Sequence, residues 1–184
     1  MLEQAGFAAV DLEEAGIAPA AEEASIESFD SFEANALAKA RYFFGLSGLP
    51  TIADDSGLAV DALGGAPGVH SKRWSGRHDL SGQELDDANN GRLLSALATA
   101  SSRSARYVCV AAYTDGGREL TARGETEGEI VKLARGGSGF GYDPYFWSRD
   151  LRATFGESST AAKEEVSHRG RAVRRLLSEI AMGR

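Results

Sequence analysis

The sequence contains a single cysteine, only four prolines and no long run of apolar residues. One cysteine cannot form a disulfide within the chain, which fits a protein of a reducing compartment that is stabilised by its packed core. Cys109 lies in the apolar run RYVCVAAY, which favours a small buried side chain over a nucleophile. No apolar stretch approaches the roughly 20 residues of a membrane span, and the first residues lack the basic start of a signal peptide. These absences predict a cytoplasmic protein with no membrane partner.

Positive charge is scarce as well. The 184 residues include 20 Lys and Arg against 27 Asp and Glu, which gives a formal net charge of −7. A nucleic-acid duplex attracts basic surfaces, so this balance argues against a nucleic-acid partner. A small anion remains a possible ligand, provided that a local basic cluster or a divalent cation neutralises its charge.

Helical and strand patterns alternate along the chain without a repeat. Asp30 and Glu33 have the spacing of a capping box, which predicts that a helix starts at Asp30, and apolar residues recur behind it at helical spacing as far as Phe44. A second helix is predicted over 82–100. Two β-rich runs on either side of the Asp-Gly-Gly at 115–117 predict a hairpin. A further helix with an apolar stripe is predicted at the end of the chain. This order predicts an α/β or α+β fold.

Asp54 and Asp55 stand side by side after the short apolar run TIA, and Ser56 and Gly57 follow at once. Hydrolysis of a phosphoric anhydride needs charge neutralisation, a positioned water and a group that takes its proton. Mg²⁺ prefers carboxylate oxygens, Ser56 can donate to a phosphate, and Gly57 allows the backbone to approach a ligand. The hypothesis is that Asp55 acts on a magnesium-bound polyphosphate and that Asp54 supports it. Taken by themselves, the same four residues favour an Asx turn between two strands, because such turns are common and a short motif is a weak signal.

The segment GGSGFGYDP, residues 136–144, contains four glycines around an aromatic pair. Glycines can expose backbone N–H groups to an anion, and Phe140 or Tyr142 can stack on a nucleobase. The alternative is a flexible turn whose aromatic side chains return to the core.

Basic residues gather in KEEVSHRGRAVRR, residues 163–175. Ser167 is a plausible N-cap that places His168 and Arg169 at a helix N-terminus, where free N–H groups favour an anion. We therefore interpret His168 and Arg169 as ligand contacts. For the later arginines a solvated basic face is the preferred interpretation.

Three long stretches occur in a fixed order: SFEANALAKARYFFGLSGLPTIADDSGLAVDALGGAPGVHSKRWSG, GGSGFGYDPYFW and KEEVSHRGRAVRRL. Together they resemble the inosine triphosphate pyrophosphatase family, whose members hydrolyse XTP, ITP and dITP to the monophosphate and pyrophosphate. The resemblance covers the chain from Ser31 to the C-terminus. It implies an α/β fold with a long curved mixed β-sheet flanked by helices, two lobes with a central nucleotide cleft, and a homodimer.

The resemblance also assigns roles residue by residue. Asp55 matches the general base and metal-associated aspartate, and Glu27 matches an acidic residue near the metal, Mg²⁺. Ser56 matches a substrate contact, and Lys163 a phosphate- or substrate-binding lysine. The segment that holds the base matches Phe140, Gly141, Tyr142 and Asp143. His168 and Arg169 match the pair that recognises the purine.

The sequence departs from the family pattern at its front. Family members begin with a strand and a Thr/Ser-Asn-Lys motif that cradles the triphosphate, and this sequence has no such segment. Residues 1–184 are expected to form a single domain of this family without that segment.

The resemblance implies an enzyme, a nucleoside triphosphate pyrophosphatase in which water activated by Asp55 attacks the α-phosphorus. The alternative is a nucleotide-binding protein with weak or no catalysis, because the phosphate cradle is missing. A third possibility is a pyrophosphatase for pyrimidine or methylated nucleotides.

Overall fold

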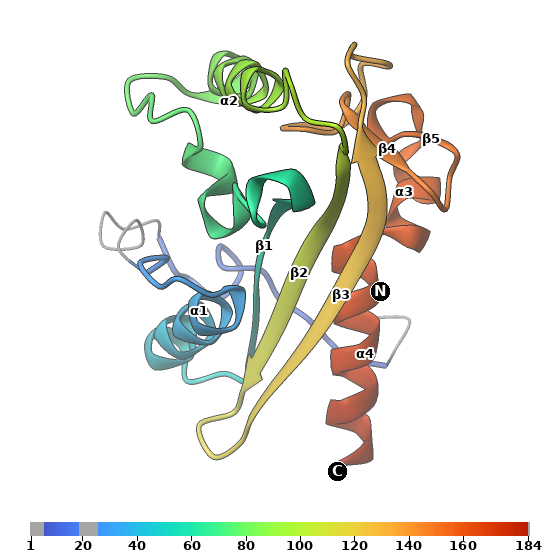
Figure 1. The fold of residues 1–184 in the computed structure, drawn as a ribbon. Coiled ribbons are helices and arrows are strands. Elements are labelled where there is room, and N and C mark those ends of the chain that lie inside the picture. The colour runs from blue at the N-terminus through green and yellow to red at the C-terminus, as the bar shows by residue number, and fades with distance from the viewer. Residues whose placement is uncertain (1–5, 19–25, 184) are drawn as a thin grey trace. The chain divides into compact units, whose positions relative to one another are not determined.

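The computed structural model describes residues 6–18 and 26–183. Along this part of the chain, a helix, a strand and a second helix are followed by a run of strands and then by two helices (Figure 1). The α-helices are α1 (Phe32–Ser47), α2 (Gly82–Ala96), α3 (Thr160–Val166) and α4 (His168–Met182). The strands are β1 (Thr51–Val60), β2 (Ser104–Thr114), β3 (Glu119–Ile130), β4 (Phe146–Ser148) and β5 (Ala153–Thr154). Short 3₁₀ turns are η3 (Asp61–Leu63), η4 (Gly68–Arg73) and η5 (Phe155–Glu157).

The five strands form one open sheet in the order β1-β2-β3-β4-β5, and neighbouring strands run antiparallel (Figure 1). The hairpin predicted at 115–117 is confirmed, because it joins β2 to β3. The register of β3 and β4 pairs Gly128 with Ser148 and Ile130 with Phe146. The predicted α/β class is confirmed, whereas the sheet that was expected to be mixed is antiparallel in the described residues.

The chain divides into two compact units. Unit 1 comprises Met1–Asp55, Cys109–Gly124 and Arg169–Arg184, and unit 2 comprises Ser56–Val108 and Glu125–His168. The three long strands β1, β2 and β3 each contribute residues to both units.

The core of unit 1 lies between α4 and the sheet. The apolar stripe of α4 packs against small side chains of β2 and β3, as the sequence predicts. The cluster consists of Cys109, Ala111, Ala122, Ala172, Leu176, Leu177 and Ile180. Small residues on the strands let the helix approach the sheet closely.

The core of unit 2 is larger and richer in aromatic rings. Phe146 and Phe155 are fully buried, and their ring centroids lie 5.1 Å apart. The other members of this cluster are Leu58, Val60, Leu93, Leu97, Ala105, Tyr107, Ile130 and Tyr142. The aromatic residues that follow the glycine-rich segment therefore contribute to the core.

Two helix boundaries differ from the prediction. Ser31, not Asp30, caps α1, because the Ser31 hydroxyl accepts a hydrogen bond from the Ala34 N–H. Helix α1 ends at Ser47 and is capped by Gly48, whose left-handed backbone allows its N–H to reach the Phe44 carbonyl. Helix α2 ends at Ala96, short of the predicted residue 100.

None of the described helices is both long enough and apolar enough to cross a bilayer.

Candidate functional site

Asp54 and Asp55 lie in the middle of one continuous strand, β1. The Asx turn between two strands is therefore wrong, because TIADDSGLAV forms a single ten-residue strand. Successive side chains of a strand point to opposite faces, so the two aspartates have different neighbours. The predicted reason for Gly57 changes as well: a Cβ there would collide with the carbonyl oxygen of Gly68 in η4. Glycine is needed at this position for close packing of the protein's own backbone.

Asp55 faces α1 and is nearly buried, with 7% of its surface exposed. Its Oδ2 accepts a hydrogen bond of 2.9 Å from Asn35 Nδ2, and its Oδ1 lies 3.6 Å from Lys39 Nζ. The same ammonium group lies 2.8 Å from Glu27 Oε1. Lys39 thus contacts both of the carboxylates that the sequence predicts as metal ligands.

This arrangement fits a divalent cation. Two carboxylates converge on one positive charge, and their combined charge exceeds that of the single ammonium group by one. Across residues 6–18 and 26–183, no three His, Cys, Asp or Glu side chains gather as a metal-binding group. Mg²⁺ commonly binds one or two carboxylates and completes its shell with water and substrate phosphates, so two carboxylates suffice.

Asp54 contacts a different set of residues in unit 1. Its Oδ2 accepts a hydrogen bond of 3.1 Å from Arg169 Nε at the start of α4, and Cys109 Sγ lies 3.5 Å away. Asp54 therefore contacts the predicted purine-binding arginine, whereas the sequence predicted that it would support Asp55. Burial, and then the carboxylate of Asp54, raise the pKa of the Cys109 thiol. A protonated buried thiol is a poor nucleophile, as the sequence predicts.

The second set of predicted site residues lies in unit 2 and is organised by Asp143. This side chain is 2% exposed and accepts hydrogen bonds from the Phe140 N–H at 3.0 Å and the Tyr107 hydroxyl at 3.3 Å. The Lys163 ammonium group forms an ion pair with the same carboxylate. Asp143 thus joins the glycine-rich segment, β2 and α3.

His168 is held in unit 2 by an aromatic stack. Its ring lies parallel to the ring of Tyr107, with centroids 4.7 Å apart and an interplanar angle of 8°. Phe155 also stacks on Tyr107, at 5.7 Å and 8°. Burial, and then the charge of Asp143, raise the pKa of Tyr107, so its hydroxyl stays protonated and can donate.

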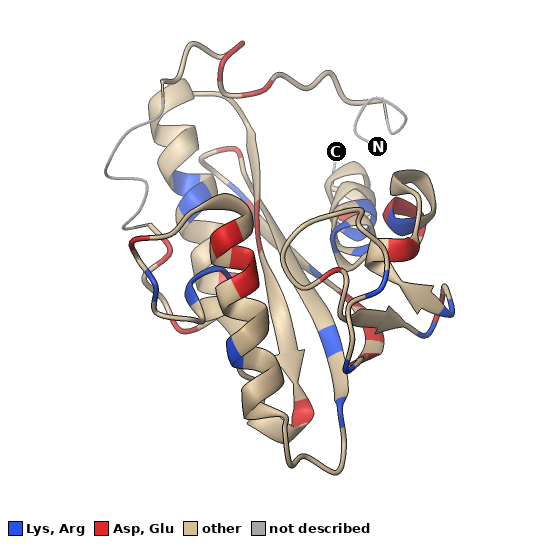
Figure 2. Cartoon of the chain, turned by 90° about the horizontal axis from the view of Figure 1, so that it is seen from above, with Lys and Arg blue, Asp and Glu red and all other residues tan. Residues whose placement is uncertain are grey.

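The glycine-rich segment uses many of its N–H groups internally. The Ser138 N–H bonds to the Gly156 carbonyl, and the Gly141 N–H donates to Asp86 Oδ2 at 2.7 Å. Asp86 belongs to the acidic beginning of α2, which also contains Glu84 and Asp87 and is partly coloured red in Figure 2. The N–H groups of Ser138, Phe140 and Gly141 therefore already have protein acceptors, so among the four glycines the Gly141 N–H is not free to bind an anion in this arrangement.

The two aromatic residues of this segment have different surroundings. Tyr142 is 4% exposed, belongs to the core of unit 2 and donates its hydroxyl to the Ser71 carbonyl at 2.8 Å. Its ring is therefore a core side chain, and burial raises the pKa of its hydroxyl. Phe140 is 69% exposed, and Lys163 Nζ lies 5.1 Å from its ring centroid. Of the two rings, Phe140 is the one that can stack on a base.

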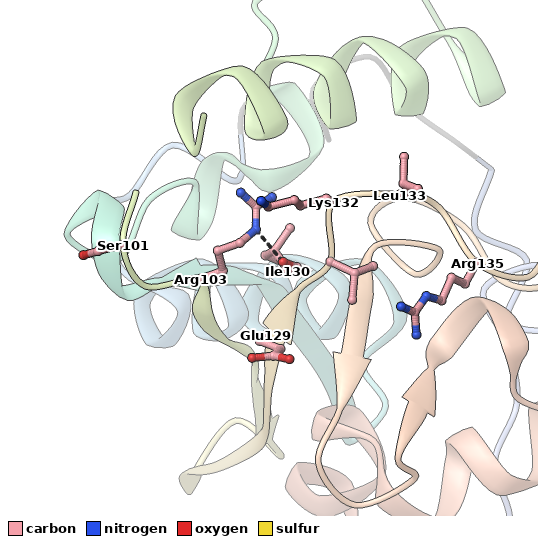
Figure 3. A pocket seen from close by; sticks show the side chains of 8 residues that line it. Ser101, Arg103, Glu129, Ile130, Lys132, Leu133 and Arg135 are labelled. Atoms are coloured by element: carbon pink, nitrogen blue, oxygen red, sulfur yellow. Dashed lines mark hydrogen bonds between the residues drawn. The ribbon is translucent and has the colours of Figure 1, made fainter. Parts of the chain in front are cut away.

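Unit 2 also contains an open groove of about 490 Å³ near the ends of β2 and β3 (Figure 3). It is lined by Ser101, Arg103, Glu129, Ile130, Val131, Lys132, Leu133 and Arg135. None of the predicted site residues lines it. Arg103 donates from Nε to the Ile130 carbonyl at 2.6 Å, which gives this arginine a structural role in the groove wall.

The predicted site residues thus fall into two groups, one in each unit. Glu27, Asp55 and Arg169 belong to unit 1; Ser56, Phe140, Gly141, Tyr142, Asp143, Lys163 and His168 belong to unit 2. The division separates Asp55 from Ser56 and His168 from Arg169, which are neighbours in the sequence.

Sequence analysis missed three residues that contact the predicted site residues within one group or the other: Asn35 and Lys39 in unit 1, and Tyr107 in unit 2. Asn35 and Lys39 are four residues apart and therefore share one face of α1. Asn35 is also the polar member of the buried face of α1, whose other members are Phe32, Ala36 and Ala40. A polar residue on an apolar helix face is a signal that sequence alone provides. Tyr107 gives no such signal, because an aromatic residue is ordinary in a buried strand.

Comparison with known proteins identifies the family. Residues 1–179 match the model of the Ham1 family. The dITP/XTP pyrophosphatase of Nocardia farcinica is 46% identical over 184 residues, covering 98% of this chain and 86% of the relative. The structure of the Staphylococcus aureus Ham1 protein superposes with a TM-score of 0.78 at 34% identity, covering 86% of this chain and 80% of that one. A nucleoside-triphosphatase, or dITP/XTP pyrophosphatase, from Mycobacterium abscessus has a TM-score of 0.67 at 45% identity, covering 82% and 76%.

The resemblance seen in the sequence is therefore confirmed over nearly the whole chain, by sequence and by fold. The chain belongs to the Ham1 family.

Proposed function

We propose that this protein hydrolyses the non-standard purine nucleoside triphosphates XTP, ITP and dITP to the monophosphate and pyrophosphate. Its relatives from Nocardia farcinica and Mycobacterium abscessus are named for dITP and XTP. The observation that carries the proposal is the convergence of Asp55 and Glu27 on one ammonium group, at 3.6 and 2.8 Å. Two converging carboxylates whose charge exceeds that of the ammonium group suit a divalent cation, which a metal-dependent attack on a phosphoric anhydride uses. These relatives favour the hydrolase over a binding protein without catalysis.

Hydrolysis of a triphosphate generally depends on a divalent metal, and we propose Mg²⁺, held by Asp55 and Glu27. When bound, Mg²⁺ neutralises the phosphate charge and polarises the bond that breaks. Asp55 accepts the proton of the attacking water as it approaches the α-phosphorus. Its nearly complete burial and its bond to Asn35 hold the carboxylate in one orientation for this step.

The nucleotide contacts come from the remaining predicted residues. In this proposal Lys163 binds phosphate oxygens, and Ser56 donates to one of them. Phe140 offers an exposed ring for stacking on the base. Asp143 and the backbone of Gly141 and Tyr142 shape the segment that carries this ring.

His168 and Arg169 recognise the purine. The Arg169 guanidinium has five donors in one plane, and its bond from Nε to Asp54 fixes that plane. A donor directed at the 6-oxo group of the purine would be left without a partner by the 6-amino group of adenine. Such mismatches cost roughly 1–3 kcal/mol or more, which favours ITP over ATP.

Replacement of Asp55 tests the proposal. Asp55→Asn keeps the shape of the side chain but removes its negative charge, so it should leave folding intact and abolish most release of pyrophosphate from ITP. Asp87→Asn is a matched control, because Asp87 is exposed on α2 and accepts a hydrogen bond from Gln83 on the same helix. Unchanged turnover by Asp55→Asn, measured with purified protein and saturating Mg²⁺, refutes the role of Asp55.

We further propose that the chain acts as a single domain, in a homodimer, in the cytoplasm. The family resemblance supports the dimer, and the single cysteine supports a reducing compartment. Light scattering of the purified protein tests the dimer.

A further inference from the structure

We propose that Asn35 is a positioning residue that holds Asp55 and the backbone carrying Glu27 in a fixed mutual geometry. The inference rests on the proposed roles of Asp55 and Glu27 and assigns to the same site a residue that binds neither substrate nor metal. Every contact that carries it lies within unit 1.

Asn35 is fully buried in α1 and makes three hydrogen bonds with its side-chain amide. Its Oδ1 accepts from the Phe29 N–H at 3.0 Å. Its Nδ2 donates to the Phe29 carbonyl at 3.2 Å and to Asp55 Oδ2 at 2.9 Å. Both hydrogens of Nδ2 therefore have acceptors.

The two bonds to Phe29 determine which atom of the amide faces Asp55. A rotated amide would place its oxygen against the Phe29 carbonyl and its nitrogen against the Phe29 N–H, and both bonds would be lost. The second hydrogen of Nδ2 is therefore directed at Asp55 by the backbone of Phe29. Asp55 Oδ2 in turn receives a donor of fixed position.

As a consequence, the two oxygens of the Asp55 carboxylate have different partners. Oδ2 is bonded to Asn35, and Oδ1 is the oxygen on the side of Lys39, 3.6 Å from its Nζ. The Lys39 ammonium contacts Glu27 as well, so Oδ1 is the Asp55 oxygen that shares a cation with Glu27. Asn35 thereby sets the orientation of the carboxylate toward the proposed metal.

The same amide also fixes the backbone close to Glu27. Phe29 lies two residues after Glu27, and both of its backbone polar groups bond to Asn35. Asparagine is a weak helix former, and a buried amide is costly unless it is hydrogen-bonded. An apolar side chain in α1 would avoid that cost but would remove a donor from Asp55 and two bonds from the segment before the helix.

Asn35→Ala tests the inference through catalysis and metal binding. We expect kcat for ITP to fall about ten- to a hundredfold, the scale of a lost hydrogen bond to a charged group, with KM changed about twofold or less. Binding of Mn²⁺ in the absence of nucleotide, followed by electron paramagnetic resonance, should weaken by a factor of about three or more.

Asn89→Ala is the matched control. Asn89 is also a buried helical asparagine whose amide bonds to loop backbone, accepting from the Ser75 N–H at 2.7 Å and donating to the Lys72 carbonyl at 3.0 Å. No carboxylate bonds to this amide in the described structure. Thermal unfolding should show comparable destabilisation of the two variants, whereas Mn²⁺ binding should weaken only in Asn35→Ala.

Asn35→Asp separates the two functions of the amide. An aspartate keeps the acceptor for the Phe29 N–H but cannot donate to Asp55 or to the Phe29 carbonyl, and its charge repels that of Asp55, so kcat should fall at least as far as in Asn35→Ala. This variant also carries the test should Asn35→Ala fail to fold. Wild-type kcat and Mn²⁺ affinity in the folded Asp variant overturn the inference.

The Asp55→Asn variant distinguishes failure of the inference from failure of the proposed function. If Asp55→Asn hydrolyses ITP at the wild-type rate, the proposed role of Asp55 fails, and the inference fails with it. If Asp55→Asn is inactive while Asn35→Ala retains wild-type kcat and Mn²⁺ affinity, only the inference fails. In the double variant, Asn35→Ala should add little to the loss, because its effect passes through Asp55.

Discussion

The two groups of candidate site residues are built in different ways. In unit 1, the carboxylate cluster consists of Glu27, Asn35, Lys39 and Asp55 and is held mainly by regular secondary structure, because helix α1 faces strand β1 and only Glu27 comes from the segment before the helix. In unit 2, the loop group of Tyr107, Phe140, Asp143, Lys163 and His168 is assembled largely around an irregular segment, by one buried carboxylate and one aromatic stack.

This difference follows from the chemistry that each group is proposed to perform. A carboxylate that orients a water needs a rigid frame, and a helix and a strand provide one. A purine needs a flat surface and an exposed ring, which a loop can present and adjust. Activity should therefore be sensitive to the loss of single hydrogen bonds in the carboxylate cluster. In the loop group it should be sensitive to changes in backbone conformation and ring packing.

The largest effect should come from Gly139→Ala. Gly139 has a φ of +79°, and a methyl group there would collide with the Asp143 carboxylate. Because Asp143 holds both Phe140 and Lys163, KM for ITP should rise about ten- to a hundredfold. The affinity for Mn²⁺ without nucleotide should stay at the wild-type value, since the carboxylate cluster belongs to unit 1, whereas Gly139 and Asp143 belong to unit 2. Gly137→Ala is the control, because a Cβ there meets nothing within 4 Å. A parallel loss of Mn²⁺ binding in Gly139→Ala contradicts the independence of the two groups.

An intermediate effect is expected at Tyr107. Tyr107→Leu removes the stack on His168 and leaves a partly filled space beside Phe155, which should cost roughly 2–4 kcal/mol of unfolding free energy and raise KM. Tyr107→Phe keeps both stacks and loses only the hydroxyl bond to Asp143, so it should cost about 1 kcal/mol. Urea unfolding and steady-state kinetics measure both. Equal losses in the two variants would show that the hydroxyl, not the stack, is decisive.

The smallest effect concerns the thiol beside Asp54. Burial and the neighbouring carboxylate raise the pKa of Cys109 in the folded protein, whereas the pKa of a thiol in an unfolded chain is about 8.5. Below that pH the thiol is protonated in both states, and its contribution to the free energy of unfolding is fully present. Above that pH the unfolded chain ionises first, so the free energy of unfolding falls by at most about 1.4 kcal/mol per pH unit. Unfolding free energies of the wild type should therefore fall more steeply than those of Cys109→Ala above this pH. A thiol reagent should label Cys109 at pH 8 only after unfolding.

Much of the fold was predictable because it rests on local patterns. The apolar stripe of α4 and the Asp-Gly-Gly hairpin are short-range signals, and both are confirmed. The turn expected at Asp54–Gly57 was wrong, although polar residues and glycine are typical of turns. Here the aspartates contact side chains on the two faces of a strand, and Gly57 leaves room for the backbone of η4. Tertiary contacts override local preference at such positions.

The candidate site was predictable in its types of residue but not in its connections. Asp55 and Glu27 are separated by 28 residues, and nothing between them in the sequence indicates that Lys39 contacts both. The aromatic residues of the glycine-rich segment have equal claims in the sequence, and only packing distinguishes the buried Tyr142 from the exposed Phe140. Side-chain partners across distant segments depend on the finished fold, so sequence patterns cannot specify them.

Asp54 and Asp55 are adjacent and chemically identical, yet they contact different partners because successive side chains of a strand point to opposite faces of the sheet. One meets the amide and ammonium of α1, and the other meets the guanidinium at the beginning of α4. A shift of β1 by a single position would exchange them and still leave an acid facing α1, so residue type alone could not reject the error. The shift would, however, move Gly57 away from the Gly68 carbonyl and turn Leu58 and Val60 out of their core. The strand's glycine and its aliphatic end therefore determine which of two equal carboxylates becomes the proposed base.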